Sequence, residues 1–67
     1  MTPGKWKVLS NPICGEMFYR VGRVIDTDKP VHSGNIEYAG DYDRDKEACE
    51  RIAAILNLKE LYDEHNS

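Results

Sequence analysis

The sequence predicts an α+β fold: a three-stranded antiparallel sheet followed by one C-terminal helix, in the order β-β-β-α. Two observations carry this prediction. Three segments in the first two thirds of the chain alternate polar and apolar residues, as half-buried strands do. The segment from Tyr42 to Leu56 instead repeats its apolar residues with the 3.6-residue period of a helix. Successive strands followed by a helix favour an antiparallel meander with the helix on one face.

The first strand is expected over Lys5–Leu9, where Trp6 and Val8 share one face. A loop is expected over Ser10–Glu16, because this segment contains Asn, Pro and Gly. The second strand is expected over Met17–Ile25, which is rich in β-branched and aromatic residues.

Alternation divides the second strand into two faces. Arg23 interrupts the more apolar face, and this break predicts a bulge near Gly22. A long polar connection, Asp26–Gly34, leads to a third strand over Asn35–Tyr42. In that strand Tyr38 is expected to face the helix and Ala39 to face away, because the two alternate.

The helix is expected to begin after Asp45, whose short side chain is a good N-cap. Its buried face is predicted to contain Cys49, Ile52, Ala53 and Leu56. Two C-terminal boundaries remain open. Asn57 tolerates the left-handed conformation that ends helices, whereas Leu58, Leu61 and Tyr62 would continue the apolar stripe.

These elements define one domain over residues 1–67, with an ordered part of about 5–62. A chain of this length has a small core, which contributes only ~3–5 kcal/mol of net stability unless a metal, a disulfide or a partner adds to it. The predicted core comprises Trp6, Val8, Tyr19, Val21, Ile36, Tyr38, Ile52 and Leu56.

Composition indicates a cytoplasmic protein. Charged residues make up 31% of the sequence and hydrophobic residues 40%, and no apolar run is long enough to span a membrane. The start of the sequence, MTPGKWKV, lacks the apolar region of a signal peptide. Cys14 and Cys49 are therefore expected to be free thiols.

The formal net charge of −3 is unevenly distributed. Residues 1–40 carry five basic and four acidic side chains, a sum of +1, whereas residues 41–67 carry four basic and eight acidic ones, a sum of −4. The expected helix is therefore acidic, and its surface should repel nucleic acid.

Candidate binding residues lie on the sheet and in the long connection. Four basic residues of the first two strands could form a patch for an anionic partner, or could pair with Glu37 and Asp41 across strands. Phe18 lies on the face that the helix leaves open, where it contacts either a loop or a partner. The turn around His32 and Asn35 is either a small polar binding site or a turn with Gly34 at positive φ. The four basic residues are Lys5, Lys7, Arg20 and Arg23.

Enzyme and metal signatures are missing from the sequence. The segment GEMFYRVGRV lacks the spacing of a phosphate-binding loop, and no serine lies in a G-x-S-x-G motif. The acidic run DYDRDKEACE lacks the glycine of a calcium-binding loop, and the cysteines and histidines lack zinc-site spacing. We therefore expect no enzyme activity, no cofactor and no metal.

Four segments resemble a loose group of small bacterial proteins, mostly from clostridial-type Firmicutes and their mobile elements. The segments are KWKV, YRV, HSGN-x-EYAG-x-Y and DKEA-x-x-x-IAAILN, within residues 5–57. The resemblance implies a bacterial source and brings no function with it.

The order of elements is also similar to the arm-type DNA-binding domains of phage and transposon integrases. In that family a three-stranded sheet enters the major groove, and the matching positions here are Asp45–Glu47, Ile52, Ala53 and Leu56. Arm-type sheets are basic, whereas this sheet is expected to carry Glu37 and Asp41 on its open face.

Two functions follow as expectations. The first is a small non-enzymatic interaction module that binds a protein, or its own copy, through the open sheet face or an edge strand. The alternative is an arm-type DNA-binding domain, which the charge balance disfavours.

Overall fold

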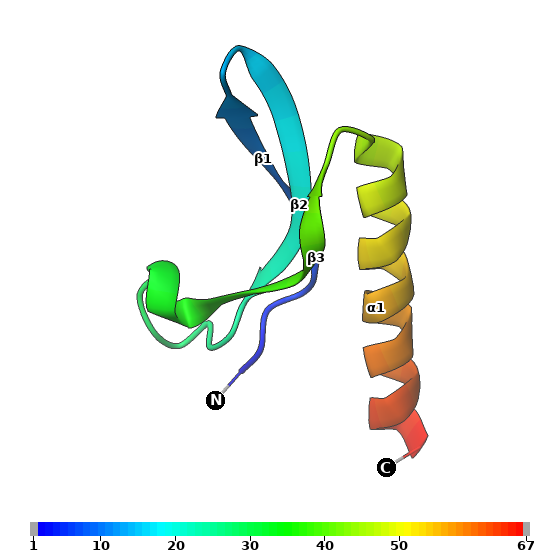
Figure 1. Cartoon of the computed structure of the whole chain (residues 1–67). Helices are drawn as coiled ribbons and strands as arrows, with labels where there is room; N and C mark the ends of the chain where they lie inside the picture. Colours follow the sequence, from blue (N-terminus) through cyan, green and yellow to red (C-terminus); the bar gives the residue numbers. More distant parts are fainter. Residues whose placement is uncertain (1, 67) are drawn as a thin grey trace.

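The computed structural model describes the backbone of residues 2–66 and the side chains of residues 2–63. The strands form one antiparallel sheet in the order β1-β2-β3, and a single long helix lies beside it (Figure 1). This arrangement confirms the predicted α+β fold. The elements are β1 (Lys7–Ile13), β2 (Glu16–Val24), the short 3-10 helix η1 (Ser33–Asn35), β3 (Ile36–Asp43) and α1 (Lys46–Asn66).

The β1–β2 hairpin is longer than the sequence predicted. The expected loop over Ser10–Glu16 is wrong, because β1 continues to Ile13 and only Cys14 and Gly15 form the turn. Both turn residues have positive φ angles, 51° and 81°, as a type I′ hairpin turn requires. Pro12 is tolerated within β1 because β1 is an edge strand and its missing N–H group can face solvent.

The β2–β3 ladder contains an irregularity, but not at the predicted position. Its register shifts opposite Arg20, where β3 contributes extra residues. Gly40 lies in this irregular segment with a φ angle of 85°, a conformation that favours glycine. Gly22, the predicted bulge position, pairs regularly with Tyr38. A Cβ atom at Gly22 would lie 3.0 Å from Cδ1 atoms of both Leu9 and Tyr38, so close packing accounts for this glycine.

Asn35 organises the connection between β2 and β3. Its Oδ1 atom accepts a hydrogen bond of 2.9 Å from the Asp26 backbone N–H, and its Nδ2 group donates to the carbonyl groups of Asp26, at 2.8 Å, and of Pro30, at 3.2 Å. The carboxylate of Asp26 in turn accepts from the backbone N–H groups of Thr2 and Asp28. Asn35 and Asp26 are both buried, so this network fixes a segment whose intervening residues, 27–34, are all exposed.

The core lies between the sheet and α1, and among residues 2–63 its buried apolar side chains are Val21, Cys49 and Ala53. Trp6, Val8, Tyr19, Ala39 and Leu56 are partly buried and pack against them. Five of the eight predicted core residues therefore belong to this cluster: Trp6, Val8, Tyr19, Val21 and Leu56.

Three predicted core residues lie outside the cluster. The pairing of Val21 with Ala39 directs Ala39 toward the helix, so Tyr38 lies on the open face and the predicted orientation of the third strand is wrong. Ile36 is only half-buried. Ile52 is 45% exposed, because α1 faces the sheet through residues on the other side of its apolar stripe.

The predicted start of α1 is correct, and its extent favours the longer alternative. The Asp45 carboxylate accepts a hydrogen bond of 3.2 Å from the Ala48 backbone N–H, as an N-cap does. The helix continues beyond Asn57 to Asn66, so Asn57 lies within the helix and does not end it. One side of α1 lies along the sheet, and no other element covers its far side (Figure 1).

The Asn35 network predicts a large stability loss for Asn35→Ala. The substitution leaves the buried N–H and carbonyl groups of Asp26 without side-chain partners, so we expect a loss of about 2–3 kcal/mol in the free energy of unfolding. Urea unfolding followed by circular dichroism measures it. Ser33→Ala, at an exposed position of the same turn, is the control and should cost less than about 0.5 kcal/mol. Equal midpoints for the two variants would contradict the structural role of Asn35.

Candidate interaction surface

The inner side of α1 is joined to the start of the sheet by side-chain hydrogen bonds. The Trp6 backbone N–H donates to the Asn57 Oδ1 atom at 2.8 Å, and the Asn57 Nδ2 group donates to the Trp6 carbonyl at 2.9 Å. The side-chain amide of Asn57 therefore makes the same pair of hydrogen bonds to the Trp6 backbone that a neighbouring β-strand would make. The Trp6 indole Nε1–H also donates to Glu60 Oε1 at 3.0 Å. These bonds hold the C-terminal half of α1 where few apolar contacts are available.

Arg23 completes this attachment, and its pairing with Glu37 agrees with one of the two alternatives for the basic residues, the cross-strand ion pair. Its guanidinium group lies 4.4 Å from the centre of the Trp6 ring and forms ion pairs with Glu37 and Glu60. The Arg23 side chain is only 18% exposed. Two carboxylates therefore neutralise Arg23 on the helix side of the sheet, and it takes no part in a basic patch on the open face. We refer to Trp6, Arg23, Glu37, Asn57 and Glu60 as the docking cluster.

The outer side of α1 is apolar and exposed. Its large side chains are between 45% and 68% exposed, and they recur with helical spacing over three turns. We call this surface the outer α1 face and define it by Ile52, Ile55, Leu58, Leu61 and Tyr62. Of these residues, Ile52 was predicted on the buried face, whereas Leu58, Leu61 and Tyr62 were expected only as a continuation of the apolar stripe in the longer helix. The sequence did indicate this surface, because its apolar residues from Ile52 to Tyr62 cover too wide an arc of the helix for all of them to be buried on one face.

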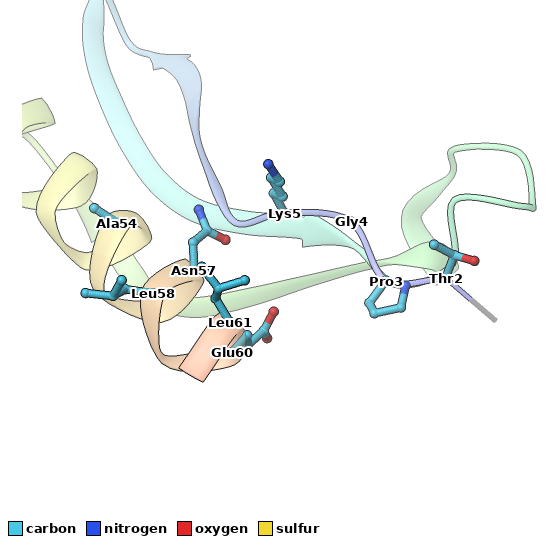
Figure 2. A pocket seen from close by; sticks show the side chains of 9 residues that line it. All are labelled: Thr2, Pro3, Gly4, Lys5, Ala54, Asn57, Leu58, Glu60 and Leu61. Carbon is cyan, nitrogen blue, oxygen red and sulfur yellow. The ribbon is translucent and has the colours of Figure 1, made fainter. Parts of the chain in front are cut away.

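A groove adjoins the outer α1 face (Figure 2). The groove has a volume of approximately 580 Å³ and separates the N-terminal segment, residues 2–5, from the C-terminal half of α1. Leu58 and Leu61 line the groove and also belong to the outer α1 face, so the two surfaces are continuous. The N-terminal segment is held in place by a hydrogen bond of 2.8 Å from the Gly4 N–H to the Val24 carbonyl.

The open face of the sheet carries a second, smaller site. The Arg20 guanidinium lies between two tyrosine rings, 3.9 Å from the centre of Tyr38 and 5.0 Å from that of Tyr42. Asn11 Nδ2 donates to the Tyr42 hydroxyl at 3.3 Å, and Arg20 Nε donates to the Gly40 carbonyl at 3.3 Å. A shallow hollow of approximately 310 Å³ opens between these side chains. Tyr38 was expected in the core, and the exposure of both tyrosines makes this face more aromatic than predicted.

The other predicted binding residues do not gather into one site. Lys5 and Lys7 are exposed near the start of the sheet. Phe18 is half-buried beneath the guanidinium of Arg44, which lies 5.4 Å from the ring centre and pairs with Glu16 at 2.7 Å. Phe18 therefore contacts the segment between β3 and α1, as the first of its two alternatives expected, and binding of a partner by Phe18 stays a prediction.

The turn around His32 is built from its own contacts. His32 Nδ1 accepts a hydrogen bond of 3.1 Å from the Gly34 N–H, which caps η1. The expected positive φ at Gly34 is wrong, because in residues 2–66 only Gly15 and Gly40 among the glycines have positive φ. A Cβ atom at Gly34 would lie 3.0 Å from His32 Cε1, so the contact with the imidazole accounts for this glycine. Asn35 is buried and uses its amide within the connection, whereas His32 and Ser33 are exposed.

The cysteines and acidic residues form no recognisable reactive centre in the described part of the chain. Cys14 is exposed and Cys49 is buried, and both are free thiols. Burial, together with the charges of Asp43 and Asp45, raises the pKa of the Cys49 thiol, so it stays protonated and unreactive. Residues 2–66 contain no cluster of three or more His, Cys, Asp or Glu side chains that could hold a metal ion.

No helix in residues 2–66 combines the length and the apolar character that crossing a membrane requires. No protein-family model, curated protein or solved structure matches the chain. The geometry of the chain itself must therefore carry the functional argument.

Proposed function

We propose that the chain is a non-enzymatic protein-interaction module and that it binds its partner through the outer α1 face. The observation that carries the proposal is the contiguous group of exposed apolar side chains on α1. Together they present on the order of 600 Å² of surface, at the upper end of what monomeric proteins expose as one patch. Patches of this size on small proteins typically mark interaction sites.

The dimensions of the chain support the proposal. The folded chain exposes 5135 Å² of surface, whereas a monomeric protein of 7.7 kDa exposes roughly 4,300 Å². Its radius of gyration is 13.0 Å, compared with about 11 Å for a compact domain of 67 residues. With three buried apolar side chains in the part of the chain whose side chains are described, the isolated domain has a smaller core than usually stabilises a fold.

The outer α1 face replaces the surfaces that the sequence suggested. The hollow on the open sheet face is small, and its lining combines Arg20 with the rings of Tyr38 and Tyr42. Both edge strands are poorly suited to strand addition, since β1 contains Pro12 and β3 is irregular at Gly40. The proposed location is the cytoplasm, where unpaired cysteines such as Cys14 are usual.

Photo-crosslinking tests this proposal in cells that produce the full chain. A photoreactive amino acid at position 58 should yield one dominant adduct of defined mass, identified by mass spectrometry as a protein. Val31 is a matched control, because its side chain is 68% exposed, as is that of Leu58, but lies outside the outer α1 face. Equal adduct patterns from positions 58 and 31, or none from position 58, would refute the proposal.

Nucleic-acid binding is a second candidate, favoured by the charge on the open sheet face. Among the described residues, neither Lys7 nor Arg20 forms an ion pair with a carboxylate. Arg20 is also held in place by its two tyrosine rings. The net charge of −3 and the loss of Arg23 to the docking cluster weaken this candidate relative to the first.

Fluorescence anisotropy with a short duplex DNA tests the second candidate. Two phosphate contacts predict that affinity falls about tenfold between ~50 and ~200 mM salt. Arg20→Ala should remove one contact and flatten this dependence, whereas Arg51→Ala on α1 should leave it unchanged. A wild-type chain that does not bind at the lower salt concentration would eliminate nucleic acid as a partner of this face.

A further inference from the structure

We infer that the partner of the outer α1 face is a second copy of this chain, whose α1 helix packs antiparallel against it. This inference rests on the proposed function and adds the identity of the partner and the geometry of the complex. Pairing two such faces would bury about 1,200 Å² in total, which reaches the size of a specific interface. Each copy would bury about 600 Å², which is of the same order as the surplus of exposed surface of one monomer, roughly 800 Å².

The spacing of the exposed residues specifies how two helices can meet. Ile55, Leu58 and Tyr62 lie at i, i+3 and i+7, the repeat that forms the seam between two packed helices. Arg51 occupies the seam position that precedes Ile55 and is exposed. Each seam residue of one helix contacts a seam residue of the other. Arg51 restricts the arrangement most, because its charged guanidinium group needs a favourable partner in an otherwise apolar seam.

An antiparallel pair satisfies all four positions when its two-fold axis passes at the level of residues 56–57. In that register Ile55 meets Leu58 of the second copy, and this contact occurs twice. Arg51 meets Tyr62 of the second copy, where a guanidinium over an aromatic ring is favourable. On one flank Ala54 meets Leu61 of the second copy, so the same helix also covers the groove beside Leu58.

A parallel pair is less favourable for two reasons. It places the two Arg51 side chains against each other in the seam, where two partly desolvated like charges repel. It also aligns the two helix dipoles, whereas an antiparallel pair brings opposite ends together. The sheet does not obstruct either arrangement, because it lies on the opposite side of α1 (Figure 1).

Electron spin resonance distance measurement tests the antiparallel register in the intact chain. Cys14→Asn removes the reactive thiol, and Asn followed by Gly15 suits a turn that requires positive φ at both positions. Cys49 remains, because it is buried. Spin labels are then attached in separate samples at Glu47→Cys and Glu50→Cys, both exposed positions.

The antiparallel register predicts label separations of about 30 Å at position 47 and about 20 Å at position 50, since each residue adds ~1.5 Å of rise. A parallel pair predicts equal separations below about 15 Å at both positions. Equal short distances would therefore overturn the register. Leu58→Glu should raise the dimer dissociation constant at least a hundredfold, because it enters the interface twice, while Val31→Glu should leave the constant unchanged.

A labelled chain that sediments as a monomer and gives no dipolar signal up to millimolar concentration would overturn the second-copy inference. The photo-crosslinking experiment separates this failure from failure of the proposed function. An adduct from position 58 with a different protein would preserve the interaction module and remove self-association. No adduct would remove both.

Discussion

The fold depends on how Trp6 and Asn57 join the two ends of the chain. Residues 51 positions apart exchange two backbone–side-chain hydrogen bonds, and the Trp6 ring carries Arg23 on its face. Glu60 then binds both the indole and the guanidinium. Because the apolar core is so small, this docking cluster supplies most of the specific contacts along the C-terminal half of α1. It therefore determines which side of the helix is buried.

That orientation has a direct functional consequence. Asn57 and Glu60 point toward the sheet, so the residues on the opposite side of α1 point away from it. Ile55, Leu58 and Leu61 are consequently exposed, although their composition is that of a core. A partner that covers them would bind only the folded chain and would therefore stabilise it by mass action. Stability and interaction are coupled in this account, which explains how so small a core can be sufficient.

The sequence predicted the fold class, the helix start and most of the core, because these depend on local periodicity and capping. The orientation of β3 was missed because alternation defines two faces without saying which one meets the helix. Tyr38 and Ala39 satisfied the pattern equally well, and the pairing of β2 with β3 decided between them. The hairpin was missed because Cys14 occupies a turn position that Asn or Asp usually holds, and because Pro12 is unusual in a strand.

The pairing of Arg23 with Glu37 was one of two alternatives, but its second partner, Glu60, and its partial burial were not predicted. A basic residue in a strand is normally exposed, and only partners 14 and 37 residues away in sequence make its partial burial acceptable. Such long-range pairing leaves no local signal. The outer α1 face did leave one, in the apolar residues from Ile52 to Tyr62, but the sequence could not show that the sheet covers only half of this stripe.

The most direct test of this account is the midpoint of thermal unfolding as a function of protein concentration. If the outer α1 face is covered by a second copy, unfolding is coupled to dissociation, and the midpoint should rise by about 5 °C for each tenfold increase in concentration. Leu58→Glu should show a low midpoint that does not change with concentration. A wild-type midpoint that stays constant over two orders of magnitude in concentration would contradict the coupling of stability to self-association.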